Sequence, residues 1–123
     1  MNVNVEIKNI EQIKSAFRRA PYLMAKNLSG AIRRVSLNIQ RESMKITPVK
    51  TGFLRRSHTT TFETGLRAIV QPTASYAGFV HDGTRFMQAR PFLADAVEIT
   101  QGFTDTEFEK AVQDTLDTIG RAT

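Results

Sequence analysis

Cysteine is absent from this 123-residue sequence. Its absence excludes disulfide bonds and thiolate metal sites, and it agrees with a reducing compartment. Long hydrophobic runs are absent too, because no stretch approaches the roughly 20 apolar residues that a membrane-spanning helix needs. The first residues alternate polar and apolar side chains and contain no apolar signal-peptide core. We therefore expect neither a membrane protein nor Sec-dependent export.

Patterns that carry catalysis or bind cofactors are also missing. The sequence has neither a GxGxxG motif nor a P-loop for phosphate binding. Its two histidines, His58 and His81, fall in different predicted elements, and neither has a second ligand at the i+4 spacing of a helical metal site. Ser57 precedes His58 in a predicted strand, where neighbouring side chains point to opposite faces. We expect a protein without enzymatic activity, metal or cofactor.

Charge is divided unevenly between the two halves of the chain, whose net charge is +5. Residues 1–62 contain 12 Lys and Arg against 3 acidic residues, and residues 63–123 contain 5 against 9. This division has three interpretations: a nucleic-acid surface on the basic side, head-to-tail contact between copies, or two solvated faces.

Hydrophobic periodicity predicts a strand followed by helices in the first half. Residues 3–7 alternate as in a half-buried strand, and helical spacing then runs from Asn9 to Pro21, where proline should stop or kink the helix. A long helix follows over residues 22–45. Its buried stripe is formed by Met24, Leu28, Ile32, Val35, Ile39 and Ile46. Its opposite face is basic. Two apolar residues on that face could contact a partner: Leu37 and Met44.

The second half predicts a hairpin and two further helices. Residues 58–62 and 66–71 read as antiparallel strands, and residues 74–82 as a short irregular or helical segment closed by Gly83. A helix starts at Pro91, Gly102 interrupts it, and Thr104 with Glu107 forms a capping box for the last helix. Phe108, Val112, Leu116 and Ile119 share one face of that helix. Residues 47–57 and 84–90 show neither the helical nor the strand periodicity of apolar residues, and they are expected to be loops.

These elements predict one compact α+β domain over residues 1–123. A small antiparallel or mixed sheet packs against the long helix, and a C-terminal helix completes the domain. Nucleic-acid binding remains an alternative function, since three arginine doublets and the basic helix face would suit a phosphate backbone. That face lacks aromatic residues between the basic ones that could stack on bases, and the sequence contains no recognisable nucleic-acid-binding motif.

Two segments resemble the signatures of one family, the small tail-component proteins of siphophages and prophages. ITPVKTGFLRRS (residues 46–57) resembles the pattern TPVdTGxLRrS that follows the long helix there. ASYAGFVHDGTRFMQARPFL (residues 74–93) resembles the pattern in which YAxxvEfGT precedes ARPFL and a final helix. The departures are Lys50 and Phe53 in the first segment, and His81-Asp82 in the second.

The resemblance implies a structural virion protein at the head–tail junction: a neck, tail-completion or minor tail component. Such a protein is located in the virion, and in the host bacterial cytoplasm during assembly. Its partners would be copies of itself, in a ring expected to have six subunits, and other head-completion and tail proteins, with non-specific DNA contact in the channel. The residues expected at its assembly surfaces are Arg33, Arg34, Leu37, Met44, Arg55, Arg56, Arg85 and Arg90.

Overall fold

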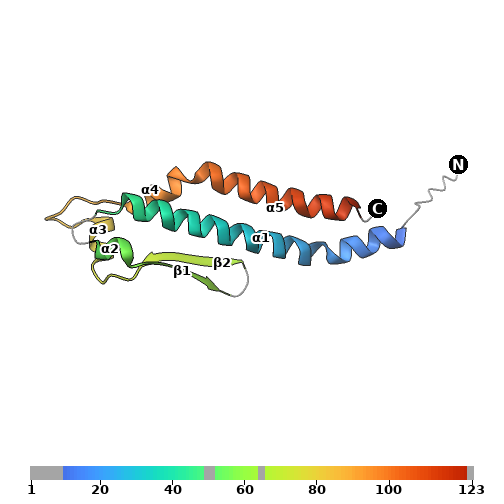
Figure 1. Ribbon diagram of the computed structural model, residues 1–123, viewed down its shortest axis with the longest axis horizontal. Coiled ribbons are helices and arrows are strands. Elements are labelled where there is room, and N and C mark those ends of the chain that lie inside the picture. Colours follow the sequence, from blue (N-terminus) through green and yellow to red (C-terminus); the bar gives the residue numbers. More distant parts are fainter. Residues whose placement is uncertain (1–9, 49–51, 64–65, 122–123) are drawn as a thin grey trace.

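The computed structural model describes residues 10–48, 52–63 and 66–121, which form an α+β domain built along one long helix (Figure 1). The elements are α1 (Ile10–Ile46), α2 (Phe53–Arg56), β1 (His58–Glu63), β2 (Arg67–Pro72), α3 (Ala77–Asp82), α4 (Phe92–Ile99) and α5 (Gln101–Arg121). Helix α5 runs antiparallel along one side of α1, and the hairpin lies along another (Figure 1). The predicted α+β fold is confirmed, whereas the strand predicted over residues 3–7 lies outside the described residues.

Helix α1 is continuous for 37 residues and passes through Pro21. Of the two outcomes predicted at this proline, the stop is therefore wrong, and the kink stays a prediction. Proline removes one backbone N–H and strains the preceding turn, but it does not force the chain out of the helix. Pro21 and its neighbour Tyr22 are exposed, so water can satisfy the carbonyl that loses its partner.

The apolar stripe of α1 faces the rest of the molecule, as predicted, apart from its last member. Val35 is buried, and Met24, Leu28, Ile32 and Ile39 are half-buried, whereas Ile46, the last residue of the helix, is 39% exposed. The basic residues predicted for the opposite face are exposed: Lys26, Arg33, Arg34, Arg41 and Lys45.

Two polar contacts fix the register of α5 against α1. Asn27 donates a hydrogen bond from Nδ2 to Oγ1 of Thr115 over 2.8 Å. Farther along α1, Arg34 forms an ion pair with Glu107. Between these contacts the interface consists of small buried side chains, including Ala31 and Ala111, which let the two helices approach closely.

The start of α5 differs from the prediction. The break after α4 falls at Thr100, whose buried hydroxyl donates to the Ala96 carbonyl over 2.8 Å. Gly102 then lies inside α5, and the Thr104 amide already donates to the Thr100 carbonyl over 2.9 Å. The predicted capping box is therefore wrong. An exposed glycine costs about 1 kcal/mol in a helix, which is too little to end one that neighbouring packing supports.

The apolar face predicted for α5 is also only partly buried. The fully buried positions are Ala111 and Thr115, whereas Val112 is 39% and Leu116 53% exposed. Small residues allow the closest helix contact, and a rotation of about 100° per residue then carries the following residue out of the interface. Val112 and Leu116 consequently lie on the surface of the isolated chain.

The hairpin is antiparallel, as predicted, and joins the long helix through a polar contact. The register pairs His58 with Pro72 and Glu63 with Arg67. Thr60 donates a hydrogen bond from its hydroxyl to Oε1 of Gln40 on α1. The segment before the hairpin, predicted as a loop, contains the short helix α2, because Gly52 supplies the left-handed residue that precedes a turn of helix.

A second core lies between the short elements, at the end of α1 where the chain leaves the helix. Its buried members are Leu54, Ala74, Ala77 and Phe92, with Val80 and Leu93 packed against them. No helix within the described ranges is long and apolar enough to cross a membrane.

Candidate assembly surfaces

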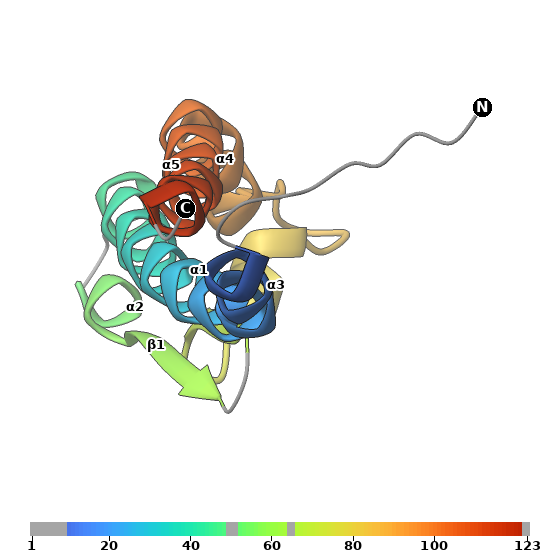
Figure 2. The same cartoon turned by 90° about the vertical axis from the view of Figure 1, so that its right-hand side faces the viewer.

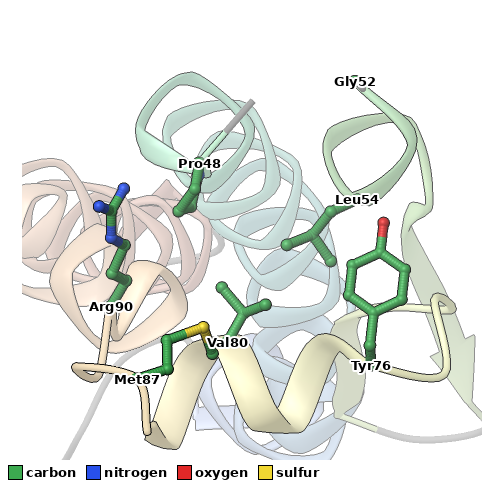
Figure 3. Close-up of a pocket in the computed structure, with 7 residues that line it drawn as sticks. All are labelled: Pro48, Gly52, Leu54, Tyr76, Val80, Met87 and Arg90. Atoms are coloured by element: carbon green, nitrogen blue, oxygen red, sulfur yellow. The ribbon is translucent and has the colours of Figure 1, made fainter. Parts of the chain in front are cut away.

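The two segments that resemble family signatures meet at one end of the molecule and form a pocket there (Figure 3). Its volume is about 330 Å³. The first segment contributes Pro48, Gly52 and Leu54, and the second contributes Tyr76, Val80, Met87 and Arg90. We call this the end pocket. Sequence reasoning predicted Arg90 but missed the apolar lining residues as members of one surface.

Local geometry explains the shape of the first segment. The Thr47 hydroxyl donates to the Ser43 carbonyl over 2.5 Å, which closes the last turn of α1. Gly52 has φ 79°, a left-handed conformation that strains a residue with a side chain. Leu54 is only 4% exposed and belongs to the core beneath this turn.

Gly83 shapes the second segment in the same way. Its φ is 78°, and a Cβ built on it would lie 2.7 Å from the backbone nitrogen of Ala89. The chain folds back here through paired hydrogen bonds between Thr84 and Met87, and the Arg90 amide donates to the Val80 carbonyl over 3.0 Å. Glycine is therefore required for the loop that carries Met87 and Arg90 to the pocket.

A buried histidine ties this end of the molecule to α1. The Nδ1 atom of His58 lies 3.1 Å from the carbonyl oxygens of both Leu54 and Arg55, so it carries the proton and donates. The Nε2 atom then accepts a hydrogen bond from the Ser43 hydroxyl over 2.8 Å. Ser43 and His58 are 0% and 5% exposed, so a substrate cannot reach this serine–histidine pair, which holds β1 to α1.

His81 has a different role beside the same core. Its Nδ1 atom lies 2.8 Å from Oδ1 of Asp82, and its ring meets the edge of Phe92 at 5.2 Å between centroids. Among the described residues, no group of three or more His, Asp or Glu side chains is arranged to hold a metal ion.

The two segments that form the end pocket also carry exposed aromatic side chains. Phe53 and Tyr76 lie with ring centroids 6.3 Å apart and are 50% and 39% exposed. Farther along the second segment, Phe79 and Phe86 are 63% and 85% exposed. The guanidinium of Arg85 lies 4.6 Å from the Phe86 ring. Aromatic residues, methionine and arginine are the types enriched at protein interfaces.

A second pocket, of about 290 Å³, lies on the basic side of the molecule, where α1 meets α2. It is lined by Leu37, Gln40, Arg41, Met44, Lys45 and Arg55. We call this the basic pocket. It brings together Leu37, Met44 and Arg55, three of the residues predicted at assembly surfaces. The pairs that Arg41 and Lys45 form with Glu42, at 3.6 and 3.1 Å, are surface pairs that stabilise the fold little.

Two predicted arginines have partners inside the chain. The Arg33 guanidinium stacks 4.2 Å from the Phe62 ring, and Arg34 pairs with Glu107. Arg56 is exposed, and its guanidinium lies beside Gly52. The eight predicted residues therefore do not form one site. Arg90 lines the end pocket, and Leu37, Met44 and Arg55 line the basic pocket. The other four lie outside the lining of both pockets: Arg33 and Arg34 on α1, Arg56 in α2 and Arg85 in the second segment.

The chain was compared with models of protein families, with curated proteins and with solved structures, and none of them matches it. A functional proposal therefore depends on the resemblance of the two segments and on the geometry of the surfaces described above.

Proposed function

We propose that this chain is a structural subunit of a tailed phage or prophage, acting at the head–tail junction as a neck, tail-completion or minor tail component. It would assemble with copies of itself into a ring and contact neighbouring head-completion and tail proteins. One observation carries the proposal: the two segments that resemble the family signatures, separated in sequence by the hairpin, line one pocket.

The surroundings of the end pocket support a role in protein contact. Leu54 and Val80 supply an apolar floor, and Arg90 supplies a charged group at the same opening (Figure 3). Protein interfaces are anchored by such combinations, in which an apolar side chain enters a pocket and an arginine fixes its orientation. Exposed Tyr76 at the pocket and Phe53 in contact with it add to the apolar surface that a partner would cover.

Charge also favours assembly between different surfaces of identical copies. Helix α1 carries eight basic residues against two acidic ones, whereas residues 92–121, which form α4 and α5, carry two against seven. Contact between unlike surfaces is heterologous, and heterologous contacts close into rings when the rotation between copies permits it.

Nucleic-acid binding is the alternative function, and the exposed basic side of α1 supports it. Lys26, Arg41 and Lys45 are exposed there and would suit a phosphate backbone, whether in the channel of a phage particle or elsewhere. Phosphate contacts of this kind are independent of sequence.

Deletion of the gene from its phage tests the proposed function. We expect DNA-filled heads and separate tails in place of joined particles, with loss of plaque formation, because the subunit would complete the junction. A plasmid copy of the unchanged gene should restore plaques. Joined particles at the parental titre in the deletion strain would contradict the proposal.

A further inference from the structure

We propose that the basic pocket of one copy receives the exposed apolar side of α5 from the next copy. This inference rests on the proposed function, because it identifies the surfaces through which copies would assemble. The donor surface is an apolar and acidic stripe along α5, which we call the α5 ridge: Asp105, Phe108, Glu109, Val112 and Leu116.

The α5 ridge is an apolar surface that nothing in the described chain covers. Helix α5 packs on α1 through Ala111 and Thr115, which leaves Val112 and Leu116 substantially exposed and Phe108 half-buried. A shallow hollow lies among Phe108, Glu109, Val112 and Gln113. These apolar residues recur at i, i+4 and i+8, so they present a continuous strip to a partner.

Acidic side chains lie on the same strip. Asp105 and Glu109 precede Val112 and Leu116 by spacings of seven residues, which places all four on one side of the helix. Asp105 accepts a hydrogen bond from Nε2 of Gln101 over 2.8 Å and is exposed, as is Glu109. A partner must therefore offer apolar surface together with positive charge.

The basic pocket offers that combination. Leu37 and Met44 are its apolar lining, and Arg41, Lys45 and Arg55 surround them. Leu37 is 47% exposed, so contact would remove apolar surface of both Leu37 and the α5 ridge from water, which favours association. A nucleic acid would pair with the cations but would leave the apolar residues of both surfaces without a partner.

The Val112–Leu116 end of the α5 ridge lies away from the basic pocket of its own subunit. The Asn27–Thr115 and Arg34–Glu107 contacts place Val112 and Leu116 level with the part of α1 that precedes Ala31. Leu37 and Met44 lie about two or more helical turns farther along α1. The basic pocket also adjoins α2, which lies on a different side of α1 from α5 (Figure 2). Contact between them therefore joins two copies, and each copy keeps one surface of each kind for the next neighbour.

Chemical cross-linking tests the contact directly, because the chain contains no cysteine of its own. Copies with Leu37→Cys are mixed with copies with Val112→Cys and treated with a short bismaleimide, as purified protein at about millimolar concentration and in assembled particles. We expect a cross-linked dimer from the mixture and none from either variant alone. Asp114→Cys, on another side of α5, replaces Val112→Cys as the matched control and should give no dimer with Leu37→Cys.

Charge exchange provides a second measurement on the full chain. Arg55→Glu should weaken association between copies about tenfold in sedimentation equilibrium, as expected for one lost charge pair. Adding Glu109→Arg to the same chain should restore most of that loss, because the pair is rebuilt with its signs exchanged. Failure of Glu109→Arg to restore association, with both variants folded, would exclude this pairing.

The outcomes separate this inference from the proposed function. If the chain is found in particles but the Leu37–Val112 cross-link is missing from both particles and concentrated protein, the inference is wrong and the proposed function stands. If the cross-link forms while deletion leaves joined, infectious particles, the contact stands and the proposed function is wrong.

Discussion

Replacing Phe92 with alanine is expected to lower the free energy of unfolding by about 3–5 kcal/mol. Phe92 is 2% exposed, and its ring lies 5.5 Å from the His58 ring and 5.2 Å from the His81 ring, between centroids. Removing it would leave a cavity beneath Leu54, where the end pocket is built. Domains of this kind have only about 5–15 kcal/mol in total, so much of the stability would be lost.

Urea denaturation measures this change as a lower midpoint with an unchanged slope. Phe86→Ala is the matched control, because Phe86 is 85% exposed and its loss should change stability by no more than about 0.5 kcal/mol. Equal stability of the Phe92→Ala and Phe86→Ala variants would show that the core between the short elements is not packed as described.

Reversing the charge of Arg55 and Arg56 together, in R55E/R56E, is expected to block completion of phage particles. Arg55 lines the basic pocket, and Arg56 is exposed beside Gly52 at the end of the molecule. Glutamate at these positions would repel the acidic residues of a neighbouring subunit and remove charge-assisted hydrogen bonds. Particle completion is measured as plaque titre and as the fraction of joined particles in micrographs.

The matched control for this experiment is R18E/R19E, which makes the same change of net charge at an exposed doublet of α1. The control should complete particles normally, because neither Arg18 nor Arg19 lines the end pocket or the basic pocket. Thermal unfolding of both variants verifies that they are folded. If folded R55E/R56E yields complete infectious phage and loses only DNA affinity in a filter-binding assay, nucleic-acid binding becomes the better account of these arginines.

The sequence predicted those parts of the fold in which a local pattern of residues is compatible with only one kind of secondary structure. The stripe of α1 gives a single apolar face to bury. The hairpin combines two runs rich in Thr, Ile and Val with a turn between them. A stop at Pro21 was wrongly expected, because the cost of proline in a helix was considered without the exposure of its site. The face of α5 was misread because the largest apolar residues were expected inside, whereas close packing of α1 and α5 selected Ala111 and Thr115 instead.

The candidate site was predictable only as separate pieces. The two motif segments and their arginines could be found by their resemblance to the family signatures, but their meeting in the end pocket depends on the hairpin that folds between them. The bond between Ser43 and His58 joins α1 to β1, and no local pattern indicated it. The α5 ridge emerged only when the structure showed which residues Ala111 and Thr115 displace to the surface.

Electron microscopy of the purified virion tests the central claim most directly. The account predicts repeated copies of this chain in the density at the head–tail junction or in the adjoining tail, arranged as a ring. In that density, the end that carries Tyr76, Met87 and Arg90 should contact a neighbouring protein. Purified, infectious particles that contain no density for the chain, and no peptide from it by mass spectrometry, would contradict the account.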